Sequence, residues 1–219
     1  EGTGFLTKAA DICGKDQKTP LDFGGCLHGI GHGVLAMEGY ELEDLVAALK
    51  DCDLLKGDFS LGCYNGAFME FNTRTMFNSQ TRSYDSSKPY YPCNSIPSSY
   101  QADCFYELPA WWRTQLSDNF SQMGSLCLGL TEEKSEKCFR GIGRIARDEK
   151  AYDEAKISRV CGLMPQRGKA ACIKEAIQMQ SIADKKSYLE LCAILDTKAE
   201  EQCIIESREY LCKVINICQ

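Results

Sequence analysis

The sequence predicts an all-α protein: an α-α superhelix, or solenoid, of about six helical hairpins. Two features lead to this prediction. Cysteines recur in pairs along most of the 219 residues, and stretches in which apolar residues have helical spacing accompany these pairs. The second cysteines of successive pairs lie 31 to 41 residues apart, a period that is typical of helical-hairpin arrays. We therefore expect one helical-repeat domain that covers residues 1–219.

The spacing of the cysteines is nearly constant. Twelve of the fourteen form six pairs, with a separation of 13 residues in the first pair and 11 in the other five. The sequence contains no Cys-x-x-Cys motif, so it lacks the usual signature of zinc ribbons, thioredoxin-like redox sites and c-type haem attachment. Disulfides formed in an oxidising compartment are favoured instead, which predicts an extracellular, periplasmic or secretory-lumen protein.

One helical pattern follows each second cysteine, and another precedes most first cysteines. We call them A helices and B helices; residues 40–52 and 152–161 are two of the expected B helices. Helix breakers or caps separate the two cysteines of most pairs: Gly57, Pro97 with Ser98, Thr131, Pro165 with Gly168, and Asp196 with Thr197. On one unbroken helix, an offset of 11 residues would hold the cysteines about 16 Å apart, beyond disulfide reach. A helix–turn–helix arrangement brings them together.

About seven disulfides are therefore expected, most of which tie a B helix to the next A helix. Fourteen cysteines allow many connectivities, and the spacing favours local pairing. The expected bridges are Cys13–Cys26, Cys52–Cys63, Cys93–Cys104, Cys127–Cys138, Cys161–Cys172, Cys192–Cys203 and, from the two remaining cysteines, Cys212–Cys218.

The second repeat departs from the pattern. Residues 72–92 stand where a B helix is expected, yet they are polar turn-formers interspersed with tyrosines. We expect a long ordered loop inserted into this repeat. Such a loop is either an exposed irregular segment or a functional lid over the preceding repeat.

Charge and hydropathy exclude some classes of partner. The chain has 31 acidic and 25 basic residues, a net charge of −6, which argues against a general nucleic-acid binder. No apolar run approaches the roughly 20 residues that a membrane-spanning helix needs, so no membrane span is expected.

The period, the helix pairing and a glycine three residues after the second cysteine resemble the tetratricopeptide-like superfamily, specifically its cysteine-rich secreted helical-hairpin members. The glycines are Gly29, Gly66 and Gly141. The resemblance implies that this small residue lets neighbouring helices pack closely. In the other repeats glutamate replaces the glycine, at Glu107, Glu175 and Glu206.

The two histidines of the chain, His28 and His32, lie four residues apart among the glycines of the first A helix. At this spacing both imidazoles lie on one helix face and can reach one point. Two neutral imidazoles suit a divalent metal ion, Zn2+ or Cu2+. Glu70 of the next A helix and Glu38 at the end of the first are the candidate third ligands. Alternatively, the histidines have only a structural role and cover one face of the helix.

Alignment of the A helices on their second cysteines places further polar residues level with the histidines. These candidate ligand-binding residues are Asn65, Tyr106, Arg140, Arg144 and Lys174. Tetratricopeptide-like domains that clamp a carboxylate use polar and basic residues four apart on successive A helices, so the resemblance implies a small anionic ligand on the concave face. Trp111 and Trp112 are adjacent in the sequence, so we expect one in the core and one facing the groove.

These observations favour a secreted helical-repeat protein that binds a metal ion or a small anionic ligand at a His-centred site. One alternative is a hydrolase or lyase that uses His28 and His32 as acid and base or as metal ligands. No motif signals a reaction class. Another alternative is a scaffold that binds a peptide or another subunit and forms an oligomer.

Overall fold

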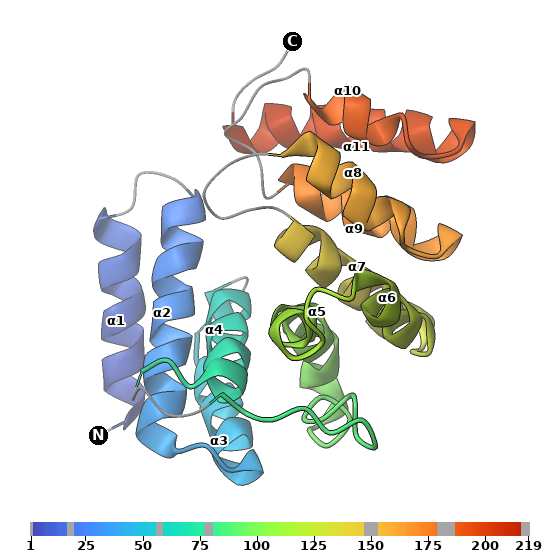
Figure 1. The fold of residues 1–219 in the computed structure, drawn as a ribbon. Helices are drawn as coiled ribbons and strands as arrows, with labels where there is room; N and C mark the ends of the chain where they lie inside the picture. Colours follow the sequence, from blue (N-terminus) through green and yellow to red (C-terminus); the bar gives the residue numbers. More distant parts are fainter. Residues whose placement is uncertain are drawn as a thin grey trace. The chain divides into compact units, whose positions relative to one another are not determined.

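A computed structural model of the chain describes residues 2–16, 20–55, 59–76, 81–146, 153–178 and 187–215 (Figure 1). Within these ranges the regular structure is entirely helical, in agreement with the predicted fold class. The helices are α1 (Gly2–Asp16), α2 (Pro20–Glu38), α3 (Leu42–Cys52), α4 (Phe59–Thr73), α5 (Ser98–Gln115), α6 (Phe120–Leu128), α7 (Glu132–Ala146), α8 (Glu154–Gly162), α9 (Gln166–Gln178), α10 (Ser187–Cys192) and α11 (Thr197–Ile215).

Contacts between the helices divide the chain into two compact units, residues 1–111 and 112–219. Helix α5 begins in the first unit and ends in the second. We describe each unit by itself. That the chain forms a single domain stays a prediction.

In the first unit, α1 packs beside α2, and α2 and α4 pack along each other with α3 against both (Figure 1). Gly39 ends α2 with a φ of +129°, a conformation that glycine adopts without steric cost. The buried side chains of this unit are almost all apolar: Leu27, Val34, Leu35, Leu45, Leu49, Ala67, Phe68 and Phe71.

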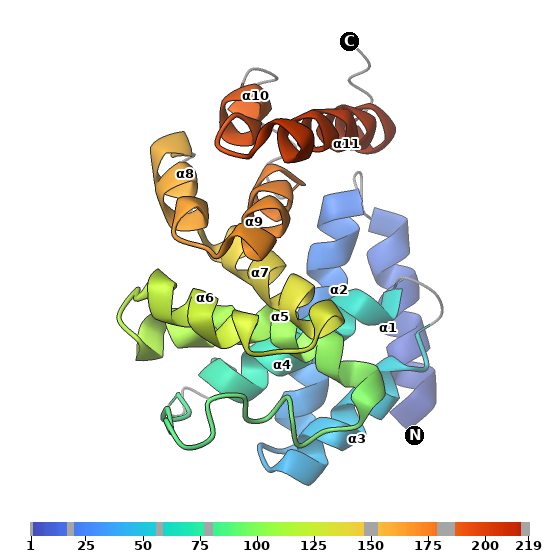
Figure 2. The same cartoon turned by 90° about the vertical axis from the view of Figure 1, so that its right-hand side faces the viewer.

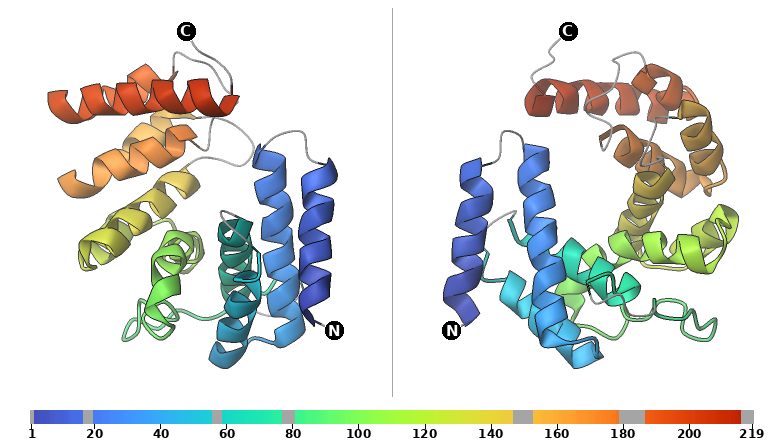
Figure 3. Two further views of the ribbon diagram at one scale, coloured as in Figure 1. Left: turned by 180° about the vertical axis from the view of Figure 1, so that it is seen from behind. Right: turned by 60° about the vertical axis from the view of Figure 1, so that its left-hand side comes forward.

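In the second unit the A helices α7, α9 and α11 follow one another in a stack (Figure 3). The B helices α8 and α10 lie along one side of it, each against its own A helix (Figure 2). Asp196 caps α11, because its Oδ1 accepts a hydrogen bond from the Ala199 N–H at 3.1 Å. The helical hairpin is thus the repeating element here, as the sequence predicts.

Six disulfides have both cysteines among the described residues, each tying an A helix to the segment before it, and all six are predicted pairs. They are Cys13–Cys26, Cys52–Cys63, Cys93–Cys104, Cys127–Cys138, Cys161–Cys172 and Cys192–Cys203. Their Cα–Cα distances are 5.4 to 5.7 Å, within the usual range for disulfides. The predicted bridge Cys212–Cys218 involves Cys218, which lies outside the described residues.

The inserted loop takes the place of the third B helix. Residues 81–97 are not helical, and Arg82 anchors them. Its guanidinium lies over the ring of Trp111, 3.6 Å from the centroid, and donates to Asn72 Oδ1 at 2.8 Å. The expectation that only one tryptophan lies in the core is wrong: Trp111 and Trp112 are 1% and 0% exposed, and the loop covers Trp111.

Helices α2 and α4 come into backbone contact at two glycines. A Cβ on Gly31 would collide with the carbonyl oxygen of Cys63, and a Cβ on Gly66 would collide with that of His28. By contrast, a Cβ on Gly33, two residues further along α2, would meet no atom within 4 Å. Gly31 and Gly66 are therefore required for packing.

This difference predicts opposite effects of two neighbouring substitutions. Gly31→Ala should lower the free energy of unfolding by about 1–3 kcal/mol, because the helices must separate to accept the methyl group. Gly33→Ala should raise it by about 0.5–1 kcal/mol, because alanine restricts the unfolded chain and favours helix. Denaturant unfolding of the oxidised proteins measures both, and equal effects would contradict this account of the crossing.

Candidate functional site

His28 and His32 lie one turn apart on α2, and their rings are in contact. The centroids are 4.8 Å apart with an angle of 70° between the ring planes, and the two Nε2 atoms are 3.2 Å apart. Both side chains are partly buried. The spacing in the sequence thus brings the imidazoles together edge to face.

Glu70 of α4 reaches the other side of the His32 ring. Its Oε2 lies 2.8 Å from His32 Nδ1, and its side chain is completely buried. The close approach of the helices explains this contact, because Glu70 lies one turn after Gly66 and His32 directly follows Gly31. The crossing of α2 and α4 therefore places the carboxylate.

Three further donors surround the Glu70 carboxylate. The hydroxyls of Tyr40 and Thr75 donate to Oε1 and Oε2, each at 2.6 Å, and the Met76 N–H donates to Oε1 at 2.9 Å. Burial acts to raise the pKa of Glu70, but the hydrogen bonds from Thr75, Tyr40, His32 and Met76 outweigh it, and the pKa lies below its usual range. Glu70 is therefore a carboxylate at neutral pH.

An ionised Glu70 assigns the proton on Nδ1 of His32. A carboxylate only accepts hydrogen bonds, so Nδ1 of His32 carries the proton that Glu70 accepts. With Nδ1 protonated, Nε2 of a neutral His32 ring carries a lone pair that can accept a hydrogen bond from His28 across the 3.2 Å contact. Glu70 thus fixes the tautomer of His32 and presents a basic nitrogen to His28.

The environment of Glu70 also changes the pKa of Tyr40. Burial, and then the hydrogen bond to Glu70 and the charge of that carboxylate, raise the pKa of Tyr40 to about 12. The Arg74 guanidinium lies 5.1 Å from the centre of the Tyr40 ring. Tyr40 therefore remains a hydrogen-bond donor over the whole physiological range.

Glu70 was expected as a third metal ligand. Its carboxylate faces Nδ1 of His32, whereas the Nε2 atoms of His28 and His32 face each other on the other side of that ring. Within the described ranges, no group of three or more His, Cys, Asp and Glu side chains is arranged to hold a metal ion. In this geometry Glu70 holds the His32 ring, and the two histidines offer nitrogens to one point. The metal set of His28, His32 and Glu70 stays a prediction.

The other predicted ligand residues lie in both units. In the first unit, Asn65 of α4 has a buried Oδ1 without a hydrogen-bond partner, and Tyr106 of α5 is half-buried. Arg140, Arg144 and Lys174 belong to the second unit. Whether they share a face with the histidines stays a prediction.

Glutamates neutralise two of these basic residues. Arg140 Nε lies 2.6 Å from Glu175 Oε2, and Lys174 Nζ lies 2.5 Å from Glu206 Oε2. In both pairs the base stands two residues after its cysteine, and the glutamate stands three residues after the cysteine of the next A helix. An arginine or lysine that is already paired gains less from an anionic ligand than a free one.

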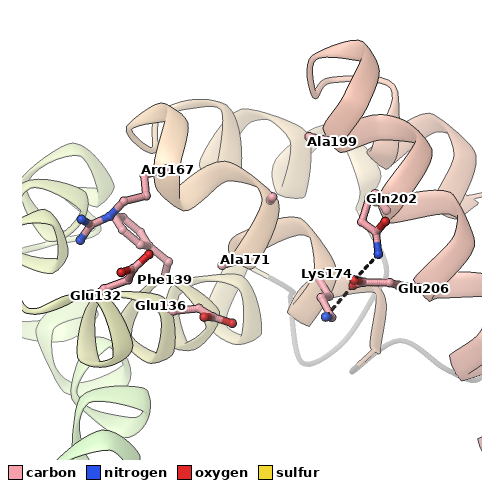
Figure 4. Close-up of a pocket in the computed structure, with 11 residues that line it drawn as sticks. Glu132, Glu136, Phe139, Arg167, Ala171, Lys174, Ala199, Gln202 and Glu206 are labelled. Atoms are coloured by element: carbon pink, nitrogen blue, oxygen red, sulfur yellow. Dashed lines mark hydrogen bonds and ion pairs between the residues drawn. The ribbon is translucent and has the colours of Figure 1, made fainter.

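Figure 4 shows the second of these ion pairs at one end of a hollow between α7, α9 and α11. The hollow has a volume of about 340 Å³. Lys174, Glu206 and Gln202 lie at one end, and Glu132 and Arg167 lie at the other. The charges of its lining are mixed, with acidic and basic side chains at both ends.

Sequence reasoning missed Tyr40, Thr75 and the role of the glutamates that replace glycine. No spacing rule singles out Tyr40 or Thr75, since both lie outside the aligned A-helix positions. Two of these glutamates, Glu175 and Glu206, did leave a signal. Each lies three residues after a cysteine, and the preceding A helix has an arginine or lysine two residues after its cysteine.

Comparison with known protein families, with curated proteins and with solved structures finds no significant match for this chain. Among the helices of the described residues, none is long and apolar enough to cross a membrane. Function is therefore inferred below from the geometry of the chain itself.

Replacement of Glu70 tests the arrangement around its carboxylate. All four partners donate, so the amide –NH2 of Glu70→Gln would face donors in either orientation. We expect this variant to lose about 1–3 kcal/mol of unfolding free energy near pH 7. Glu38→Gln, at the exposed end of α2, should change it little.

The stability difference between wild type and Glu70→Gln should also depend on pH. The pKa of Glu70 is lowered in the folded state, so its contribution to stability is present above the unfolded pKa of about 4.3 and is lost as pH falls through the folded pKa. The stability difference between wild type and Glu70→Gln should therefore shrink between about pH 5 and pH 3. Denaturant unfolding across this interval measures it, and a constant difference would contradict an ionised Glu70.

Proposed function

We propose that His28 and His32 bind one divalent transition-metal ion, Zn2+ or Cu2+, through their Nε2 atoms. The observation that carries the proposal is the Nε2–Nε2 distance of 3.2 Å. Two nitrogens bound at about 2.0–2.1 Å to one tetrahedral ion lie about 3.3 Å apart. The rings already have the spacing of two ligands of one ion.

Glu70 supports the proposal from the second coordination sphere. Metal-binding histidines usually donate their other ring N–H to a carboxylate, which fixes the tautomer and increases the basicity of the ligand nitrogen. Glu70 stands in this relation to His32, and Tyr40 and Thr75 hold Glu70 in turn. On metal binding, the proton on His28 Nε2 would leave or move to Nδ1.

A site with two protein ligands leaves further coordination positions for water or an exogenous ligand. A small carboxylate or phosphate would complete the coordination there, which joins the two ligand classes that the sequence favoured. Cysteine thiolates do not compete, because the cysteines in the described ranges are in disulfides.

The disulfides also indicate the compartment in which the protein works. Six bridges in one chain are typical of extracellular, periplasmic or secretory-lumen proteins. We infer a binding protein of such a compartment, built from hairpins of the tetratricopeptide-like type. The period of the cysteines and the packed helix pairs support that architecture.

Acid–base catalysis is the second candidate function, and one observation favours it. Glu70, His32 and His28 form a hydrogen-bonded chain in which a carboxylate orients a base, as in many catalytic groups. A hydrolase or lyase would use His32 as the base. Metal binding remains the first proposal because the Nε2–Nε2 distance gives both histidines a role as ligands.

Titration of the oxidised full chain with Zn2+ and with Cu2+ tests the proposal. Calorimetry should show one ion per chain, and His28→Ala and His32→Ala should each abolish this binding. Glu70→Gln should weaken it about 10–100-fold through the lost second-sphere contact, while Glu38→Gln should not.

Circular dichroism of each variant establishes that it is folded. Stoichiometric binding that survives His32→Ala in a folded protein would contradict the proposed ligands. No binding to wild type at millimolar metal would overturn the metal function and favour the acid–base alternative.

A further inference from the structure

Among the described residues, Arg82 in the inserted loop is a cation for which no carboxylate acts as counter-ion. Its Nη2 donates to two neutral oxygens, Asn72 Oδ1 at 2.8 Å and the Tyr91 carbonyl at 2.9 Å. Its Nε is buried and has no hydrogen-bond partner. No carboxylate in the described part of the chain forms an ion pair with Arg82.

Aromatic rings hold the guanidinium in this position. It lies 3.6 Å from the centre of a Trp111 ring and 5.1 Å from the centre of the Tyr91 ring. The Trp111 N–H donates to the Arg82 carbonyl oxygen at 2.9 Å. The side chain is therefore fixed before any ligand arrives, which lowers the entropic cost of binding.

Arg82 stays charged at neutral pH although its surroundings oppose the charge. Burial, together with the nearby Arg74, lowers the pKa of Arg82 to about 10. A half-buried cation that is compensated only by neutral dipoles and ring faces retains much of its desolvation cost. An anion bound beside it would offset that cost.

A hollow of about 360 Å³ opens beside Arg82. It is lined by Arg82, Ser83, Asp85, Lys88 and Tyr91. The Asp85 carboxylate is held within the loop, because its Oδ1 accepts hydrogen bonds from the Ser87 hydroxyl at 2.7 Å and from the Ser87 N–H at 2.8 Å. Those hydrogen bonds, and to a lesser extent the charge of Lys88, lower the pKa of Asp85.

The charge of the lining is therefore +1. Asp85 balances Lys88, and the charge of Arg82 remains. The lining offers donors of three kinds: the guanidinium of Arg82, the ammonium group of Lys88 and the hydroxyl of Ser83. A delocalised guanidinium charge combined with a point charge and a hydroxyl suits an oxyanion that has oxygens in several directions.

We propose that this hollow binds a tetrahedral oxyanion, namely phosphate or sulfate, either free or as a group on a larger molecule. The site lies in the loop that replaces a B helix, and its residues are separate from the histidines, Glu70 and Tyr40. It therefore does not depend on metal binding. On this proposal the loop is a binding element, whereas the sequence left open an exposed irregular segment or a lid.

Inorganic phosphate is the first probe, added to the oxidised full chain at constant ionic strength against chloride. We expect saturable binding by calorimetry and a change in tryptophan fluorescence, since Trp111 contacts Arg82. Lys88→Gln should weaken the affinity about tenfold, the usual effect of losing a charged hydrogen bond. Lys50→Gln, which removes an exposed lysine from the last turn of α3, is the matched control and should bind as wild type does.

Arg82→Lys keeps the charge but removes the planar guanidinium that the rings of Trp111 and Tyr91 hold, so it should bind phosphate more weakly than wild type. If this variant fails to fold, Ser83→Ala and Lys88→Gln still decide the matter, because both side chains line the hollow without packing in the core. Unchanged phosphate affinity in folded Lys88→Gln and Ser83→Ala would overturn the proposal, as would no binding beyond that of chloride.

Sulfate, acetate and a simple phosphomonoester separate the remaining cases. Tighter binding of the monoester than of inorganic phosphate would assign the site to a phosphate group on a larger molecule, and equal binding would assign it to the free ion. Acetate that binds as tightly as phosphate would contradict the tetrahedral class.

Discussion

Backbone contact between consecutive A helices is the constraint on which the candidate site depends. Gly31 of α2 and Gly66 of α4 lie where a Cβ would collide with the facing backbone. Gly143 of α7 has the same relation to Cys172 of α9 in the second unit. When two helices touch without side chains between them, their register cannot slide. Side chains one turn beyond the contact, such as Glu70, therefore meet a fixed partner.

Disulfides and glycines stabilise different contacts. Each bridge ties an A helix to the segment before it and restricts the unfolded chain, whereas the glycines allow one A helix to pack on the next. The loop before α5 shows that a disulfide can be kept where the repeat lacks a B helix. There the Cys93–Cys104 bridge is retained without a B helix, and Arg82 between aromatic rings supplies the missing anchor.

Equivalent positions carry different chemistry in the two units. In the second unit, a base two residues after the cysteine meets a glutamate three residues after the next one, as Arg140 meets Glu175. In the first unit the same two positions are His28 and Gly66, and the glycine contacts the histidine backbone. The carboxylate comes instead from Glu70, which neutral donors and a histidine hold. The proposed metal ion would bind at the imidazoles of this position, whereas a charged arginine at the same position would repel it.

The sequence by itself determined the helical fold, the six described disulfides and the pairing of His28 with His32. All three follow from regular spacing along the chain, because helix period and loop length are local properties. Tertiary structure decided the position of Glu70 behind the His32 ring, the contribution of Tyr40 and Thr75, and the burial of Trp111 under Arg82. These contacts join residues far apart in the chain, and they depend on where helices cross and how a loop folds back. Spacing carries no information about either.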